Sequence, residues 1–300
     1  MRLIAGSSGA LGTGFRQVLR ARGDEFVRMQ LPWGEPGEVA ERVVSYWRAA
    51  EAAGPSDSPI TLVWAAGTGS VGAPEAAMVA ETEALAAVVA ALARAVRPDL
   101  ANCVLFASSA GAIYGGHGSG VITEVTPPSP ITPYGREKLA QEAAVASLQT
   151  AGAMRAVACR FTNIYGLADG RLRRKGLVAA LVESAMLRQP VRLFVSPDTR
   201  RDYLYNVDAA RLALAEADVA SAATPTGTIV RAGSTVTIVN LVASISRVLR
   251  RRVPVVFAES PESRVQPLAL QFPERTGVQA SVPTTSFEAA VREMAGAPRG

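Results

Sequence analysis

The fold is decided by the opening stretch Leu3-Ile4-Ala5-Gly6-Ser7-Ser8-Gly9-Ala10-Leu11-Gly12. Its three apolar residues predict a short buried strand, and the spacing of Phe15, Val18 and Leu19 predicts a helix after the glycines. A glycine loop between a strand and a helix is typical of dinucleotide binding, because glycines let the backbone approach a pyrophosphate whose charge the helix N-terminus attracts. An ordinary glycine-rich turn is the alternative. The residues expected to bind the dinucleotide are Gly6, Ser8, Gly9, Ala10, Leu11 and Gly12.

Apolar strand candidates alternate with helical patterns through the first half of the chain. We expect strands near 25–30, 60–66, 103–107 and 155–161, and helices near 39–53, 75–96 and 134–150. This alternation predicts an α/β fold with a Rossmann-like, doubly wound parallel sheet.

After Tyr165 the pattern changes to helices mixed with short strands. The helices are expected near 177–187, 207–218 and 238–249, and the strands near 191–195, 228–231 and 253–257. We therefore predict a dinucleotide-binding domain at 1–167 and a smaller mixed α/β C-terminal substrate lobe at 168–300, some of whose segments return to the sheet.

The composition is that of a globular protein. The chain has 300 residues, 49% of them hydrophobic, which excludes disorder as the main state. Its apolar stretches, such as 84–93, are about half the roughly 20 residues that a bilayer needs, so we expect no membrane span. Cys103 and Cys159 lie in apolar runs and are expected to be buried, reduced thiols. With no signal peptide expected before the first strand, these features predict a cytoplasmic protein.

The charge of the chain favours an anionic small molecule as its ligand. The net charge is +5, but the basic residues are spread along the chain and form no nucleic-acid-binding motif, so we expect no nucleic-acid partner. The single histidine, His117, excludes a histidine-rich metal site, and no metal is expected.

The segment Tyr134-Gly135-Arg136-Glu137-Lys138 carries the clearest chemical signal. Tyr134 and Lys138 are four residues apart and share a helix face. A free tyrosine titrates near 10, and a neighbouring ammonium favours its phenolate, which makes the residue a better proton carrier at neutral pH. A surface pair on an amphipathic helix is the alternative. The chain has only two lysines, and an arginine could not replace a compact ammonium here, so we predict an active-site pair.

The end of the second strand bears on the choice of cofactor. An acidic residue there would bind the adenosine ribose of NAD, but the position falls on Gln30. Arg28 lies two residues earlier, on the same strand face. The missing carboxylate and the nearby arginine favour NADP(H), whose 2′-phosphate a carboxylate would repel. A solvated edge arginine is equally compatible with the sequence.

Six motifs occur together in a recognisable order: Gly6–Gly12, Trp64–Gly67, Ser108–Gly115, Tyr134–Lys138, Arg160–Gly166 and Arg201–Tyr205. Their combination resembles the extended short-chain dehydrogenase/reductases, specifically the NAD(P)-dependent nucleotide-sugar epimerase/dehydratase family, over about residues 1–260. The resemblance implies a homodimer built on helices beside the active site. It also implies that Ala65, Ala66 and Gly67 contact the cofactor.

The resemblance assigns roles to individual residues. Tyr134 would be the acid/base, Lys138 would hold the nicotinamide ribose, and Ser109 would hydrogen-bond the reacting oxygen, although the family's usual hydroxyl position falls on Ala110. Substrate-binding residues are expected at Asn163, Arg201 and Arg264, with Asp202 and Tyr203 supporting that loop. The family's asparagine in the helix at 75–96 corresponds to Glu81.

Two other features stay open at this point. The basic cluster at 171–175 faces phosphate or is a solvated loop, and His117 is a loop residue bordering the presumed substrate site.

The resemblance leaves more than one reaction open. Dehydratases and decarboxylases of this group carry carboxylates beside the hydroxyl residue, where this chain has Ala110, Gly111 and Ala112, so neither reaction is expected. We favour a 4-ketoreductase of a keto-hexose or keto-deoxyhexose nucleotide, with an NAD-dependent nucleotide-sugar 4-epimerase as the alternative. A third possibility, of another class, is a dinucleotide-binding sensor or scaffold without catalysis.

Overall fold

A six-stranded parallel sheet forms the centre of the computed structural model, which describes residues 1–55, 57–67, 69, 72–118, 120–173, 175–221, 223, 227–258 and 267–299. The strands pair in the order β2-β1-β3-β4-β5-β9, and each pairing is parallel. They are β1 (Arg2–Ala5), β2 (Phe26–Arg28), β3 (Thr61–Trp64), β4 (Cys103–Ser109), β5 (Arg155–Phe161) and β9 (Gly227–Val230). The predicted Rossmann-like fold class is confirmed.

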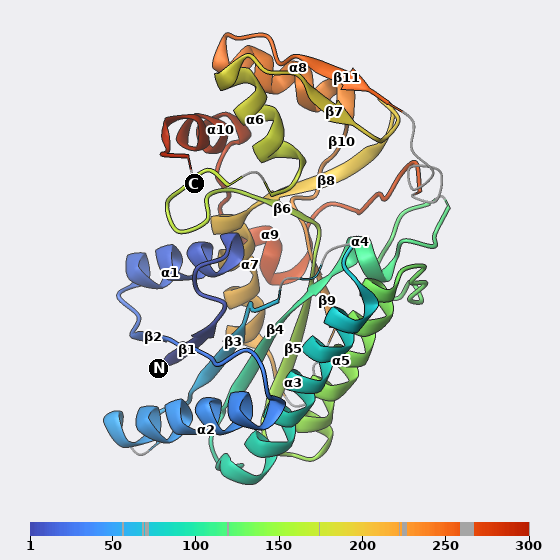
Figure 1. The fold of residues 1–300 in the computed structure, drawn as a ribbon. Coiled ribbons are helices and arrows are strands. Elements are labelled where there is room, and N and C mark those ends of the chain that lie inside the picture. The colour runs from blue at the N-terminus through green and yellow to red at the C-terminus, as the bar shows by residue number, and fades with distance from the viewer. Residues whose placement is uncertain are drawn as a thin grey trace.

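Helices cover both faces of this sheet (Figure 1). One face carries α1 (Ala10–Arg22) and α7 (Asn206–Val219), with α9 (Gly277–Ser281) against α7. The other carries α2 (Pro36–Ala53), α3 (Glu75–Ala95) and α5 (Pro133–Thr150). Two apolar clusters lie on either side of the strands, so each layer is held by burial of apolar surface.

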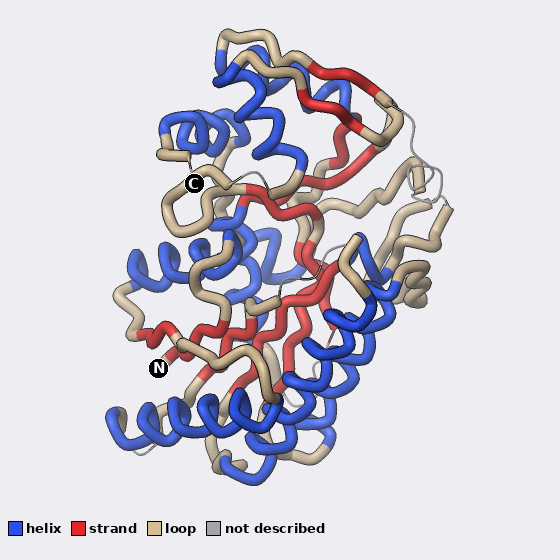
Figure 2. The backbone as a smooth tube through the Cα atoms, viewed as in Figure 1, coloured by secondary structure: helices blue, strands red, loops and turns tan. Residues whose placement is uncertain are grey.

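The C-terminal lobe contains two small sheets and three helices. One sheet has the order β10-β8-β6 and the other pairs β11 with β7. Figure 2 shows short strands, in red, among the helices at the top of the view. The strands are β6 (Asn163–Tyr165), β7 (Val191–Leu193), β8 (Arg200–Tyr205), β10 (Thr235–Thr237) and β11 (Val255–Phe257). The helices are α6 (Leu177–Leu187), α8 (Ile238–Leu249) and α10 (Phe287–Gly296), and a short α4 (Ala110–Ile113) follows β4.

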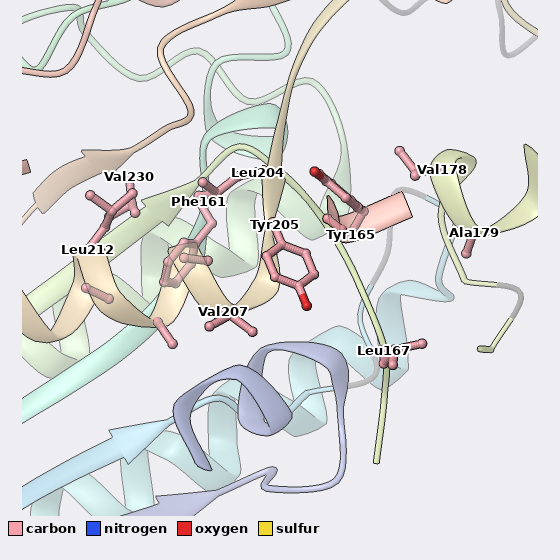
Figure 3. Packing of buried hydrophobic residues seen from close by; sticks show 14 of the residues in the cluster. Phe161, Tyr165, Leu167, Val178, Ala179, Leu204, Tyr205, Val207, Leu212 and Val230 are labelled. Carbon is pink, nitrogen blue, oxygen red and sulfur yellow. The ribbon is translucent and has the colours of Figure 1, made fainter. Parts of the chain in front are cut away.

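The lobe shares its core with one face of the central sheet. Figure 3 shows Phe161, Tyr165 and Tyr205 packed with Leu204 and Val207, so β5, β6, β8 and α7 meet in one apolar cluster. The same cluster extends to Phe15 in α1 and to the inner faces of α6, α8 and α10. Strand β9, although it lies within the predicted lobe in sequence, is the sixth strand of the central sheet. The division at residue 167 stays a prediction.

The cysteines and α3 bear on two expectations from the sequence. Cys103 and Cys159 are free and buried, as expected, and burial raises the pKa of both thiols. Helix α3 is long and apolar enough to cross a membrane, with a mean hydropathy of 1.7 over 18 residues. The apolar segment is therefore longer than the stretch 84–93 on which the prediction of no membrane span was based. It packs between α2 and α5. A helix in the layer of a folded domain can also be this long and this apolar.

Candidate functional site

The glycine loop folds tightly because two glycines meet. A Cβ on Gly12 would overlap the carbonyl oxygen of Gly6, and the Gly9 amide donates to that same oxygen at 3.2 Å. Gly6 has φ +76°, and a Cβ there would lie 2.5 Å from the Ala65 carbonyl oxygen. The loop therefore sits against the end of β3, where the strand order reverses between β1 and β3. In such sheets ligands bind at this switch point.

The loop leaves the N-terminus of α1 open. Gly9 is its N-cap, no side chain caps it, and Gly9 and Ser8 are exposed. A Cβ on Gly9 would meet only one atom, the Gly6 carbonyl oxygen at 3.6 Å. The open backbone and the uncapped helix end fit the pyrophosphate of a dinucleotide.

Arginines surround the other side of the loop. Arg28 ends β2, is exposed, and donates from Nε to the Ser7 hydroxyl at 3.2 Å. Arg16 is buried and donates to the Ser7 carbonyl oxygen at 3.0 Å and to the Asp169 carboxylate at 2.7 Å. Arg16 first, then Arg28 and Arg173, lower the pKa of Asp169. Arg28 thus lies where the adenosine ribose is held in this fold class, whereas Gln30 makes a backbone contact with Tyr46.

Tyr134 lies in the first turn of α5, and the local sequence sets its position. Thr132 caps the helix by accepting from the Gly135 amide at 3.2 Å. A Cβ on Gly135 would overlap the Ala112 carbonyl oxygen, so glycine lets α5 approach α4 closely. This places the Tyr134 side chain near that of Ser109, the last residue of β4, where the serine acts to lower the pKa of the tyrosine. Ser109 also accepts from the Ala112 amide at 3.4 Å as the N-cap of α4, so it both caps the helix and meets the tyrosine.

The pKa of Tyr134 is higher than the sequence led us to expect. Burial raises it, the hydrogen bond from Ser109 lowers it, and the nearby Glu81 raises it. The expected phenolate-stabilising effect of Lys138 is not among the causes, because the Lys138 ammonium lies 5.9 Å from the centre of the Tyr134 ring and is bound elsewhere. Helical spacing predicted the pairing of the two residues but not where the ammonium points.

Lys138 is 6% exposed, and other groups hold its ammonium. Nζ donates to the Gln141 side-chain oxygen at 2.9 Å and to the Ala107 carbonyl oxygen at 3.3 Å, and it lies 4.9 Å from the centre of the Phe106 ring. Burial lowers the pKa of Lys138 to about 8, although Glu81 and Glu142 act to raise it. Gln141 was not predicted from the sequence, although it is three residues from Lys138 and therefore on the same helix face.

The predicted substrate residues Asn163 and Arg201 lie on the paired strands β6 and β8 of the three-stranded sheet. The Asn163 amide donates to the Asp202 carbonyl oxygen at 2.9 Å. The Arg201 guanidinium donates to the carbonyl oxygens of Pro267 at 3.0 Å and Arg200 at 2.8 Å, and burial lowers its pKa. In the described part of the chain, Arg201 forms no ion pair. Arg264 lies outside the described residues.

Asp202 supports this region, as the sequence suggested for it. Its side chain is fully buried and accepts from the Thr162 hydroxyl at 2.5 Å and from the amides of Ala232, Gly233 and Ser234 at 2.9 to 3.1 Å. Burial nevertheless raises the pKa of Asp202, against these hydrogen bonds. It ties β8 to the loop after β9 and thereby fixes the neighbouring Arg201.

The remaining sequence candidates take separate positions. Glu81, in place of the family's asparagine, accepts from the Gly69 amide at 3.2 Å, and Gly69 packs against the Tyr134 ring. The half-buried His117 contacts the Pro127 carbonyl oxygen at 2.8 Å. Of the basic cluster, Arg171 and Arg173 are exposed, and residue 174 lies outside the described residues.

Comparisons with known proteins agree with this geometry. A model described as "NAD dependent epimerase/dehydratase family" matches residues 2–230. A putative UDP-glucose 4-epimerase of Methanocaldococcus jannaschii is 26% identical over 108 residues, so the match spans about a third of each protein, 36% of this chain and 35% of the other.

Two solved structures share the fold along nearly the whole chain. MoeE5 in complex with UDP-glucose and NAD has a TM-score of 0.76 at 20% identity, covering 98% of this chain and 97% of that one. The UDP-glucose 4-epimerase of Brucella ovis in complex with NAD has a TM-score of 0.76 at 23% identity, with coverage of 98% and 97%.

Proposed function

The chain belongs to the NAD dependent epimerase/dehydratase family and is therefore an enzyme, and from this premise we propose that it is a 4-epimerase of a nucleoside-diphosphate hexose. The observation that carries the proposal is the buried Lys138 ammonium 5.9 Å from the centre of the Tyr134 ring, with Ser109 near the same tyrosine. A sensor or scaffold would need no proton carrier at this point. The named activities of the similar proteins support epimerisation over the 4-ketoreduction that the sequence favoured.

The residues of the site divide the chemistry between them. A bound nicotinamide dinucleotide supplies reversible hydride transfer. Tyr134 takes the proton of the sugar 4-hydroxyl during oxidation and returns it during reduction. Ser109 holds the same oxygen, and the Lys138 charge favours the phenolate when its third N–H reaches towards the ribose and the phenol. Gly6, Gly9, Gly12 and Ala65 would hold the dinucleotide at the sheet edge.

Arg201 and Asn163 would bind the sugar nucleotide. A largely buried guanidinium that is satisfied by carbonyl oxygens keeps its charge available for an anion. A diphosphate matches that charge and accepts hydrogen bonds in the geometry that arginine offers. Helix α4 supplies Ala110, Gly111 and Ala112 and no carboxylate, which argues against dehydration across C5–C6.

Arg28 favours a second candidate, an NADPH-dependent 4-ketoreductase of a keto-sugar nucleotide in deoxysugar biosynthesis. Such an enzyme exchanges its cofactor at every turnover, and an arginine at the end of β2 suits a 2′-phosphate. An epimerase instead retains its dinucleotide through a closed cycle of oxidation and reduction. The identity of a retained dinucleotide therefore separates the two reactions.

We also propose a homodimer in the cytoplasm, built on α3 and α5. Both helices expose residues at alternating spacings of four and three, which is the spacing of a helix–helix seam. On α3 these are Val79, Glu83, Ala86, Ala90 and Ala93, and on α5 they are Arg136, Ala140, Ala143, Ser147 and Thr150. The many small side chains let helices from two copies approach closely.

The first experiment identifies the cofactor and the reaction together. Freshly purified protein is denatured and any released dinucleotide is identified by mass, and the protein is then incubated with UDP-glucose and the products are separated. Stoichiometric NAD and formation of the 4-epimer support the epimerase. An empty protein that reduces a 4-keto-sugar nucleotide with NADPH supports the ketoreductase.

The Tyr134→Phe variant should still bind the dinucleotide, and its turnover should fall at least about a hundredfold. Equal turnover by this variant would contradict both candidates.

A further inference from the structure

The Lys138 ammonium has two hydrogen-bond acceptors in the described part of the chain. They are the Gln141 side-chain oxygen at 2.9 Å and the Ala107 carbonyl oxygen at 3.3 Å. An ammonium has three N–H donors, so one remains for a bound molecule or for Tyr134. The shorter of the two bonds comes from a side chain, and a side chain can be exchanged without changing the backbone.

A second hydrogen bond fixes the orientation of the Gln141 amide. Its Nε2 donates to the Thr82 hydroxyl at 3.0 Å, and that hydroxyl donates to the Met78 carbonyl oxygen at 3.2 Å. Because the Thr82 proton is used on Met78, its oxygen can only accept from Gln141. The reversed amide would turn N–H donors against an ammonium, so Oε1 must face Lys138.

Charged groups face Lys138 from two helices. Glu81 projects from α3 and Glu142 from α5, and both act to raise the pKa of Lys138 through space. Glu142 is engaged elsewhere, since it accepts from Arg160 at 2.7 Å and from the Ser108 hydroxyl at 2.5 Å. Among the described side chains, Gln141 is thus the neutral one that accepts a hydrogen bond from the ammonium, in a place where burial opposes the charge.

We propose that Gln141 is a positioning residue that holds the Lys138 ammonium charged and in place beside Tyr134, with Thr82 locking the amide in the orientation that does so. Residues from α3 and α5 are therefore joined in one chain of hydrogen bonds ending at the active-site lysine. The inference rests on the proposed function for its meaning in catalysis. Its physical content, control of the Lys138 charge by Gln141, is measurable without any substrate.

The two lysines of the chain make this measurement simple. Protein made with lysine labelled with ¹³C at Cε alone should give one Cε signal for each of the two lysines in a ¹H–¹³C spectrum, and Lys175→Arg assigns them. Lys175 is exposed and serves as the internal reference. In Gln141→Met the pKa of Lys138 should fall by about one pH unit, because an acceptor to the charged form is lost. In Gln141→Glu it should rise by about one pH unit, and Thr82→Val should lower it by less than Gln141→Met does.

The matched control replaces another glutamine of α5 whose side-chain oxygen also accepts a hydrogen bond. Gln149 lies on the same helix and accepts from the Ala156 amide at 3.0 Å, so Gln149→Met loses a hydrogen bond far from Lys138. Its Lys138 titration should match the wild type. A pKa of Lys138 that is equal in the wild type and Gln141→Met, or shifts of the same sign in Gln141→Met and Gln141→Glu, would overturn the proposal. If Gln141→Met does not fold, Thr82→Val and Gln141→Glu still carry the test.

The activity measurement separates this inference from the proposed function. In a wild type that converts a sugar nucleotide, Gln141→Met should lower kcat about tenfold or more with little change in KM, and should shift the pH profile. A wild type without turnover contradicts the proposed function and leaves the Lys138 titration to decide the role of Gln141. Turnover with an unchanged pH profile in Gln141→Met contradicts the role in catalysis alone.

Discussion

The burial of Lys138 opposes the charge that its proposed role needs. Its pKa is about 8 in the folded protein, against 10.5 for an ordinary lysine. Between these values the unfolded chain binds more protons than the folded one, so this residue makes stability rise with pH across that window. The free energy of unfolding of the wild type minus that of Lys138→Met should increase by roughly 3 kcal/mol from pH 7 to pH 10.5.

Urea unfolding of both proteins at the two pH values measures this difference. Tyrosines and cysteines also titrate in this range, but they do so in both proteins and cancel. Lys175→Met, which removes an exposed lysine, should show no such increase. A constant difference between the wild type and Lys138→Met would mean that Lys138 keeps an ordinary pKa.

Arg28 tests the choice of cofactor at the scale of one side chain. If it contacts the 2′-phosphate, Arg28→Glu should weaken NADPH binding about tenfold or more and leave NADH binding within about twofold, because a carboxylate repels the added phosphate. Quenching of tryptophan fluorescence during titration gives both dissociation constants. Arg48→Glu, on α2, is a control for the change in net charge. A parallel loss for both dinucleotides would place Arg28 outside the discrimination of the cofactor.

The sequence could predict some site residues because their partners are local. Tyr134 and Lys138 share a helix face by their spacing, and the structure places them together. The hydrogen bonds around Lys138 could not be predicted from the sequence. Gln141 contacts Thr82, 59 residues away, only once α3 and α5 have packed together. The same reason explains Arg16, whose contact with Asp169 joins residues 153 apart. Long-range side-chain pairs follow from the packed fold and not from local patterns.

At the scale of elements, two glycines of the loop should have different roles, one in folding and one in dinucleotide binding. Gly12 is needed for the turn, since a Cβ there overlaps the Gly6 carbonyl oxygen, whereas Gly9 has room for one. Gly9 also has φ −68°, which alanine adopts without strain. Gly9→Ala should therefore keep the free energy of unfolding within about 1 kcal/mol while weakening dinucleotide binding about tenfold or more, since the methyl group projects where the pyrophosphate approaches.

Chemical denaturation and a binding titration measure the two effects. Gly12→Ala serves as the contrast, and it should lose stability by several kcal/mol together with binding. Full affinity in Gly9→Ala would show that the dinucleotide does not approach the loop at this residue.

The elements that the sequence identified are those with long, regular patterns. Strand β5 and helices α6 and α8 have the predicted bounds, and the other central strands and helices differ by a few residues. Strands β6, β8 and β10 and helices α9 and α10 were not predicted as such. Strand β8 contains Arg201, Asp202 and Tyr203, which are typical of a binding motif, and the buried Asp202 breaks the apolar alternation. Burial of that carboxylate depends on amides from a loop thirty residues away, which no local pattern contains.

At the scale of the whole molecule, one core joins the two predicted domains. The apolar cluster that contains Phe15 of α1 also contains Leu181 of α6 and Met294 of α10. Asn206 adds a polar link, since its amide donates to the Ala10 carbonyl oxygen at 2.7 Å and to that of Leu167 at 3.0 Å. The glycine loop and the C-terminal lobe are therefore held against each other. A linear pattern of strands and helices could predict the composition of the lobe but not this shared packing.

The proposed dimer tests the molecule at its largest scale. Ala90 is exposed in the middle of α3, so Ala90→Arg adds a long charged side chain to the proposed seam without disturbing the core of one copy. We expect the wild type to have twice the mass of one chain by light scattering, and Ala90→Arg to shift it towards a monomer with unchanged far-ultraviolet circular dichroism. Ala52→Arg, at an exposed site on α2, should stay dimeric. An arginine buried against its own copy in the second chain has no partner to offset its desolvation, which is why Ala90→Arg should break the dimer. A monomeric wild type, or an Ala90→Arg variant that is as dimeric as the wild type, would show that α3 is not in the interface.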